Sequence, residues 1–236
     1  MKGQKEMTGE RKVYAVITGD LISSSDMNYS DRDSVLTFLH DSFSFISNCL
    51  DPGSGVLLPV DISRGDSFQI MLDEPEDALF ASVLLLLKFG VFSEKNNKLA
   101  ARISIGIGSV EYLPYSGNVG EADGQAFRLS GKKLDNMKEE GKHLLITTAN
   151  PALNLILESQ CAFFDNMAAR WTGVQKGILL EKFSGLTQDE IALKLGKSQS
   201  TISQSLKAAG FDVLRKFLDN YASLFEYPEI FLMGNE

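Results

Sequence analysis

The pattern of apolar residues changes near residue 150, and this change constrains the fold more than any other feature of the sequence. Before it, β-branched runs such as "KVYAVIT" (12–18) alternate with segments of helical periodicity. From Pro151 onward there is no strand pattern, and helical periodicity continues to about Phe225. Apolar side chains recur about every 2 residues on one face of a strand and about every 3.6 in a helix. The sequence therefore predicts two domains, residues 1–150 and residues 151–236.

The first domain has the order strand, helix, strand, strand, helix, strand, followed by one more helix and a last strand. Two such strand–helix units that share a hairpin predict an α+β fold, a ferredoxin-like sheet with helices on one face. The second domain is predicted to be all helical. The expected strands are 12–18, 56–62, 67–72, 100–113 and 143–148, and the expected helices of this domain are 34–50, 75–92 and 125–137.

Charge is distributed unevenly between the two parts of this 236-residue chain, whose net charge is −8. Residues 168–221 contain eight Lys/Arg and five Asp/Glu, a net charge of +3, so the remainder carries −11. An acidic body with a mildly basic C-terminal module is compatible with DNA binding. The excess is smaller than DNA-binding domains usually show, so charge alone is weak support.

The composition also bears on location and on cysteine chemistry. The most apolar run, residues 78–87, stops at Lys88, well short of the roughly 20 residues needed to span a bilayer. We therefore expect a cytoplasmic protein without membrane contact. Cys49 and Cys161 form no CxxC pair and accompany no histidine cluster. Both are expected to be buried structural thiols rather than a metal or redox site.

Residues 187–206 have the layout of a helix-turn-helix. Thr187 and Glu190 have the spacing of a capping box that begins a helix. Gly196 can supply a left-handed turn residue, and Ser198 can cap the second helix. The apolar positions that would pack the two helices together, and against a supporting helix within 171–183, are Ile191, Ala192, Leu195, Ile202 and Leu206.

The second helix of this layout leaves a polar face, which predicts contact with DNA. In a helix-turn-helix, the N-terminal end of the second helix meets base edges in the major groove. The alternative is a helical hairpin that only packs or dimerises. The predicted DNA-binding residues are Lys197, Ser198, Gln199, Ser200, Thr201, Gln204 and Lys207.

A homodimer is expected if the chain binds DNA, because one recognition helix reads only a few base pairs. The last helix, 211–227, offers one candidate for the contact between copies. Its apolar stripe could instead pack inside its own chain against residues 152–157, and the sequence leaves both possibilities open. The stripe consists of Phe211, Leu214, Leu218, Tyr221 and Phe225.

Two aspartates of the first domain predict a metal site. Asp20 ends the first strand, and Asp66 lies at the tip of the predicted hairpin. In a ferredoxin-like sheet these strands are neighbours, so both carboxylates could meet at one end and hold Mg²⁺. The alternative is that both are turn residues, since Gly-Asp is common in turns.

Four segments together resemble the SatD family: "AVITGDLISSSDMNYSDRD", "SRGDSFQIML", "RISIGIGSV" and "EADGQAFRLSGKKLDNM". The same segments are more distantly similar to the palm-like domain of class III nucleotide cyclases and diguanylate cyclases. That resemblance implies that Asp20 and Asp66 hold metal against a nucleoside triphosphate. It also implies that Arg128 and Lys132 contact the nucleotide.

Departures from the cyclase pattern indicate an incomplete catalytic site. Ser67 stands where the family has an acid, and Arg128 and Lys132 stand where the cyclase helix has an Asn and an Arg. The leading hypothesis is a DNA-binding transcriptional regulator whose cyclase-like domain senses a nucleotide or mediates dimerisation. A metal-dependent nucleotidyl cyclase with a helical accessory domain is the alternative. A palm with a purely structural role is the third.

Overall fold

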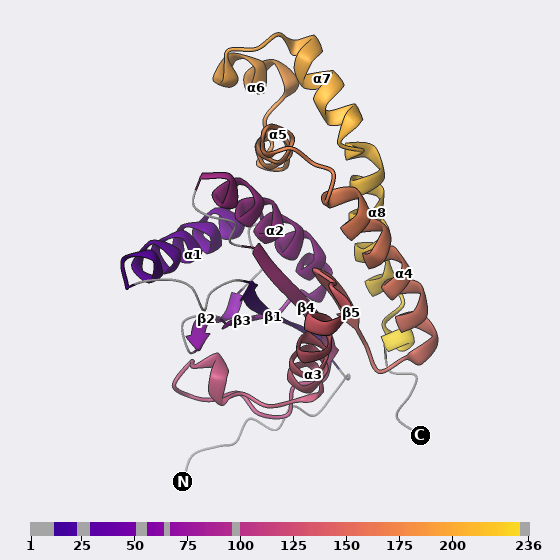
Figure 1. Cartoon of the computed structure of the whole chain (residues 1–236). Coiled ribbons are helices and arrows are strands. Elements are labelled where there is room, and N and C mark those ends of the chain that lie inside the picture. Colours follow the sequence, from indigo (N-terminus) through magenta and orange to yellow (C-terminus); the bar gives the residue numbers. More distant parts are fainter. Residues whose placement is uncertain (1–11, 23–28, 51–55, 64–66, 96–99, 232–236) are drawn as a thin grey trace.

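A mixed five-stranded sheet carries helices on both faces and continues into a group of C-terminal helices (Figure 1). This computed structural model describes residues 12–22, 29–50, 56–63, 67–95 and 100–231. The elements of the sheet domain are β1 (Tyr14–Ile22), α1 (Tyr29–Cys49), β2 (Val56–Ser63), β3 (Ser67–Leu72), α2 (Ala78–Lys95), β4 (Ala100–Gly108), α3 (Gln125–Glu140) and β5 (Leu144–Thr147).

The strand order is β2-β3-β1-β4-β5. β1 lies antiparallel between β3 and β4, with Ile17 opposite Ile70 on one side and Ile105 on the other. The first four strands therefore have the ferredoxin-like order that the sequence predicts. β5 is added parallel to β4, and α3 connects the two strands.

The two faces of the sheet are covered by different helices. Ala15, Ile17 and Leu21 share a buried cluster with residues of α1 and α2. Val16 belongs to a second cluster, which includes Ala126 of α3. The expectation of helices on one face is thus confirmed for α1 and α2, and α3 covers the opposite face. Apolar residues on both faces of β1 explain why both are covered.

The predicted strand 100–113 is too long, because β4 ends at Gly108. The chain then turns away from the sheet and folds back on the segment before α3. Tyr112 and Asp123 form an isolated antiparallel bridge there. A Cβ on Gly124 would lie 2.6 Å from Cα of Val110, so only glycine allows this approach.

The C-terminal helices begin with α4, whose first turn contains Pro151 and is capped by the Asn150 side chain. α4 packs beside β5, and α5 packs against α2. Buried residues of both parts of the chain join one continuous hydrophobic cluster. Among the residues that the structure describes, none of the helices combines the length and apolar character needed to cross a membrane. The helices are α4 (Pro151–Ala168), α5 (Gly173–Phe183), α6 (Gln188–Leu195), α7 (Gln199–Ala208) and α8 (Phe211–Ser223).

The apolar stripe of α8 is largely buried within its own chain. Leu214, Leu218 and Tyr221 are all buried, and the Tyr221 hydroxyl donates a hydrogen bond to the Pro75 carbonyl oxygen at 2.8 Å. The stripe shares its cluster with Leu157 of α4. Of the two interpretations of this stripe, packing inside the chain is confirmed for these three side chains, and they offer no contact to a second copy.

Candidate functional site

Asp20 lies near the end of β1. It is on the face of the sheet that α3 covers nearer the start of this strand. The strand register places it between Ser67 of β3 and Arg102 of β4. Arg102 Nη2 donates to Asp20 Oδ2 at 2.8 Å, and the Arg102 side chain is nearly buried. Asp66 lies outside the described residues, so the predicted meeting of Asp20 with Asp66 stays a prediction.

The described residues around Asp20 do not by themselves fit a magnesium ion. No group of three or more His, Cys, Asp or Glu side chains capable of holding a metal exists in the described part of the chain. The guanidinium of Arg102 also neutralises the Asp20 carboxylate. A divalent cation at this carboxylate would therefore face a neighbouring charge of its own sign.

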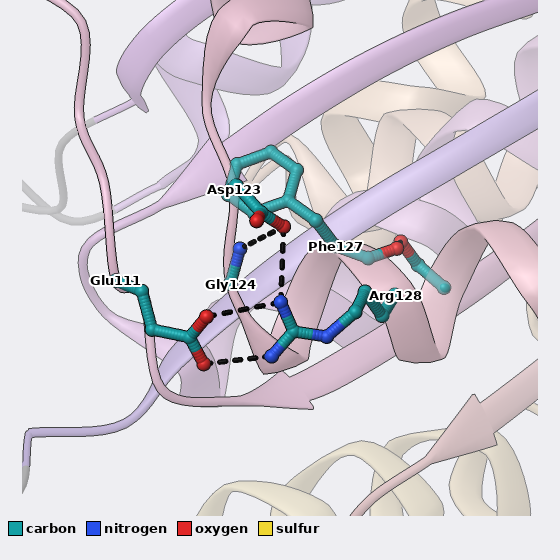
Figure 2. A network of polar contacts seen from close by, with 6 residues as sticks. Glu111, Asp123, Gly124, Phe127 and Arg128 are labelled. Carbon is teal, nitrogen blue, oxygen red and sulfur yellow. Dashed lines mark hydrogen bonds and ion pairs between the residues drawn. The ribbon is translucent and has the colours of Figure 1, made fainter.

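Arg128 sits at the start of α3, in a network of exposed ion pairs that Figure 2 shows. Its guanidinium donates to both carboxylate oxygens of Glu111, at 2.7 and 2.9 Å, and to Asp123 Oδ1 at 3.1 Å. The hydrogen bonds from Arg128 lower the pKa of the Glu111 carboxyl. Arg128 thus ties the loop before α3 to the helix, and a bound phosphate would have to displace two carboxylates.

Lys132 is exposed on α3, one turn after Arg128. Within the described residues it takes part in no ion pair. Of the two predicted nucleotide contacts, Arg128 is therefore paired with acidic side chains, whereas Lys132 is exposed to solvent.

The segment from Thr187 to Ala208 holds two short helices, each with a capped N-terminus. Thr187 and Glu190 form a reciprocal capping box at the start of α6. Gly196 adopts the left-handed conformation with φ 61° and ψ 37° and ends that helix. The Ser198 side chain then caps α7 by accepting from the backbone N–H of Thr201 at 3.2 Å. Each cap removes an unpaired backbone group, so both helix ends are well defined.

Apolar residues between α6 and α7 fix the second helix. Ile191, Ala192, Ile202 and Leu206 are buried. Leu195 departs from the prediction, because its side chain is 40% exposed. As the last residue of α6, it lies beside the turn rather than between the helices.

The polar residues predicted to contact DNA are all exposed, and α6 and α7 lie at the end of the molecule away from the sheet (Figure 1). Gln199 Nε2 donates to Gln188 Oε1 at 2.8 Å, which joins the first residues of the two helices. Gln188 was not among the residues predicted from the sequence to act in this part of the molecule. The available signal was the repeated pair of capping residue and glutamine, Thr187-Gln188 and Ser198-Gln199.

No protein-family model matches the sequence, and no curated protein matches it. The resemblance to the SatD family therefore stays a prediction. Among solved structures, the adenylate/guanylate cyclase/hydrolase from Silicibacter pomeroyi is 18% identical, with a TM-score of 0.40, over 55% of this chain and 72% of that one. The guanylyl cyclase Cya2 is 15% identical, with a TM-score of 0.39, over 59% and 76%. A bacterial light-regulated adenylyl cyclase is 14% identical, with a TM-score of 0.39, over 59% and 45%. These likenesses are too distant to assign an activity to this chain.

Proposed function

We propose that this chain is a DNA-binding transcriptional regulator that reads the major groove with the N-terminal end of α7. The observation that carries the proposal is the exposed polar end of α7, held in place by the turn at Gly196 and by the Gln188–Gln199 hydrogen bond. A single well-defined orientation of these side chains is what recognition of base edges needs.

Gln199 is the proposed base-reading residue. A glutamine amide offers one acceptor and one donor side, which match the N6 and N7 groups of adenine in the major groove. Gln188 holds the Gln199 amide through one N–H and leaves its second N–H for the base. Lys197 and Lys207 are exposed near either end of α7, where they would contact phosphates.

A second copy is expected on adjacent half-sites about one helical turn apart. The buried α8 stripe does not provide the contact, so we assign it to a groove of about 480 Å³ between α4 and α8. Phe163 and Val213 on its walls are 77% and 68% exposed. Asp212 and Lys216 also line the groove. A two-fold axis that passes midway between these two charges would place each opposite its complement in the other copy.

The test is selection of bound duplexes from a randomised DNA library, followed by gel shifts at several salt concentrations. Gln199→Ala should lose the preference for adenine at one position of each half-site. Lys197→Ala should weaken binding to all sequences alike and lower the salt slope by about one. Lys133→Ala, on the exposed side of α3, is the matched control and should leave both unchanged. Absence of any retained duplex at low salt would refute the proposal.

The dimer contact has its own test, which light scattering coupled to gel filtration provides. Phe163→Glu should convert a dimer to a monomer, while Leu193→Glu, at a similarly exposed apolar residue of α6, should not. A wild-type chain that remains monomeric at micromolar concentration would contradict the dimer.

A metal-dependent nucleotidyl cyclase is the second candidate function. The ferredoxin-like strand order and the position of Asp20 opposite the first residue of β3 favour it. Incubation with labelled ATP or GTP and Mg²⁺ tests it, with Asp20→Asn as the inactive comparison. A cyclic or dinucleotide product that depends on Asp20 would replace the first proposal as the main activity.

A further inference from the structure

A cavity of about 410 Å³ lies where the C-terminal helices meet the sheet domain. Its walls come from α2, the start of β4, the end of α4 and the start of α5. Cavities of this size hold small organic ligands, and a mostly apolar lining with a few convergent polar groups is typical of such sites. Nothing in the proposed reading of DNA uses this cavity.

Two side chains of opposite charge line the cavity without pairing with each other. Asp165 Oδ2 accepts a hydrogen bond from the backbone N–H of His143 at 2.8 Å, whereas its buried Oδ1 has no partner in the described part of the chain. Lys176 forms no ion pair there either. An unpaired polar atom in a protein interior is costly, so a ligand that supplies the missing donor is favoured.

The path of the Lys176 side chain depends on the absence of a side chain at Gly90. The lysine side chain crosses α2 at this glycine, since a Cβ on Gly90 would lie 2.5 Å from Lys176 Cδ and 3.0 Å from Nζ. Gly90 itself lines the cavity. The absence of a side chain at Gly90 therefore lets the ammonium group reach the cavity wall.

Apart from Ser93 and His143, the remaining walls are apolar and partly aromatic. The Trp171 indole is buried and held by a hydrogen bond from Nε1 to the Ala209 carbonyl oxygen at 2.8 Å. Phe164 meets it edge to face, with ring centroids 5.9 Å apart. These rings are already in place, so an apolar group entering the cavity would bury surface without reordering its walls.

We infer that this cavity binds a small zwitterion that carries an apolar group, the chemistry of a free amino acid with an apolar side chain. Its ammonium group would donate to the Asp165 carboxylate, and its carboxylate would accept from the Lys176 ammonium group. Its side chain would pack against Phe164 and Trp171. A ligand with one charge alone would leave the other charged side chain unpaired.

The cavity also offers a route to control of DNA binding, and this consequence rests on the proposed function. α5 forms part of the cavity wall through Lys176 and also packs against α7. A ligand held between α2 and α5 would stabilise one placement of α5, and through it one placement of α7. Binding to the cavity itself is measured without DNA, so the two proposals fail separately.

Isothermal titration calorimetry on the full chain tests the inference. L-phenylalanine and L-leucine should bind. Phenethylamine, which lacks the carboxylate, and 3-phenylpropionate, which lacks the ammonium group, should each bind at least about tenfold more weakly than phenylalanine. Lys176→Met should abolish the discrimination against phenethylamine, and Asp165→Asn should abolish the discrimination against 3-phenylpropionate.

Gly90→Ala provides a variant that keeps both charged residues. The new methyl group would displace the Lys176 side chain, while alanine is favoured over glycine inside a helix. Amino-acid binding should fall about tenfold in this variant with no loss of thermal stability. The inference is overturned if neither amino acid binds the wild-type chain at millimolar concentration. It is also overturned if Lys176→Met and Asp165→Asn leave both discrimination ratios at their wild-type values.

Discussion

Gly196→Ala isolates the backbone free energy of the turn between α6 and α7. Gly196 has φ 61°, and a Cβ added there would meet no atom within 4 Å. The substitution therefore adds no clash and removes no contact. The left-handed conformation costs an L-residue about 1–2 kcal/mol, so we expect the free energy of unfolding to fall by about that amount.

Gly177→Ala is the matched control for this turn. Gly177 lies inside α5, and a Cβ there would also meet nothing within 4 Å. Because alanine is favoured over glycine in a helix interior by about 1 kcal/mol, this variant should be more stable than the wild type. Two glycine-to-alanine changes in open space should thus differ by roughly 2 to 3 kcal/mol, with opposite signs.

Equilibrium urea unfolding measures this difference. The sole tryptophan of the sequence, Trp171, is buried among the C-terminal helices, so its fluorescence reports the unfolding of this region. Gly196→Ala should also reduce DNA binding, whereas Gly177→Ala should leave it unchanged. If both variants shift the midpoint in the same direction, the assignment of Gly196 as the residue that defines the turn is wrong.

Three further predictions use the same unfolding assay. Burial raises the pKa of the Asp165 carboxyl, so the folded state holds this proton more tightly than the unfolded state. The stabilisation of the folded state by this protonated carboxyl is present below the ordinary carboxyl pKa and is lost as the pH rises. Asp165→Asn should therefore stabilise the fold at neutral pH and remove that part of the pH dependence. Thr187→Ala removes the cap of α6 and should cost about 1 kcal/mol, whereas Thr37→Ala, whose hydroxyl only bonds the Asp33 carbonyl within α1, should cost almost nothing. Asp20→Asn leaves the nearly buried Arg102 without its charged partner and should cost about 2 kcal/mol, while Arg128→Gln breaks only exposed ion pairs and should cost less than about 1 kcal/mol. Equal costs for these last two would show that burial of Arg102 does not matter.

The sequence predicted most of the elements, because strand and helix periodicity are local properties of the chain. It also predicted the caps at Thr187 and Ser198, since each depends on residues at most three positions apart. The position of α3 was not predictable in this way. It depends on Gly106, where a Cβ would lie 2.1 Å from the Ala126 carbonyl oxygen, and such an approach is visible only in three dimensions.

The partners of the candidate site residues were hidden for the same reason. Asp20 and Arg102 are 82 positions apart in the chain but adjacent in the sheet. The partner of Arg128 lies 17 positions before it, in a segment that was expected to continue a strand. Sequence spacing identified which side chains could carry chemistry, whereas it could not show which of them were already neutralised.

That difference in neutralisation separates the two candidate functions. Of the described charges predicted to act on a nucleotide in the sheet domain, Asp20 and Arg128 are each engaged by an internal partner of opposite sign, whereas Lys132 is exposed and unpaired among the described residues. On α7, by contrast, Gln204 and Lys207 are exposed and form no side-chain hydrogen bond or ion pair within the described residues. Binding a nucleotide at Asp20 and Arg128 requires breaking their existing ion pairs, and each broken pair reduces the net free energy of binding. A duplex that contacts Gln204 and Lys207 would replace water rather than an internal partner, so the cost of each new contact there is the loss of that water and not the breaking of an ion pair.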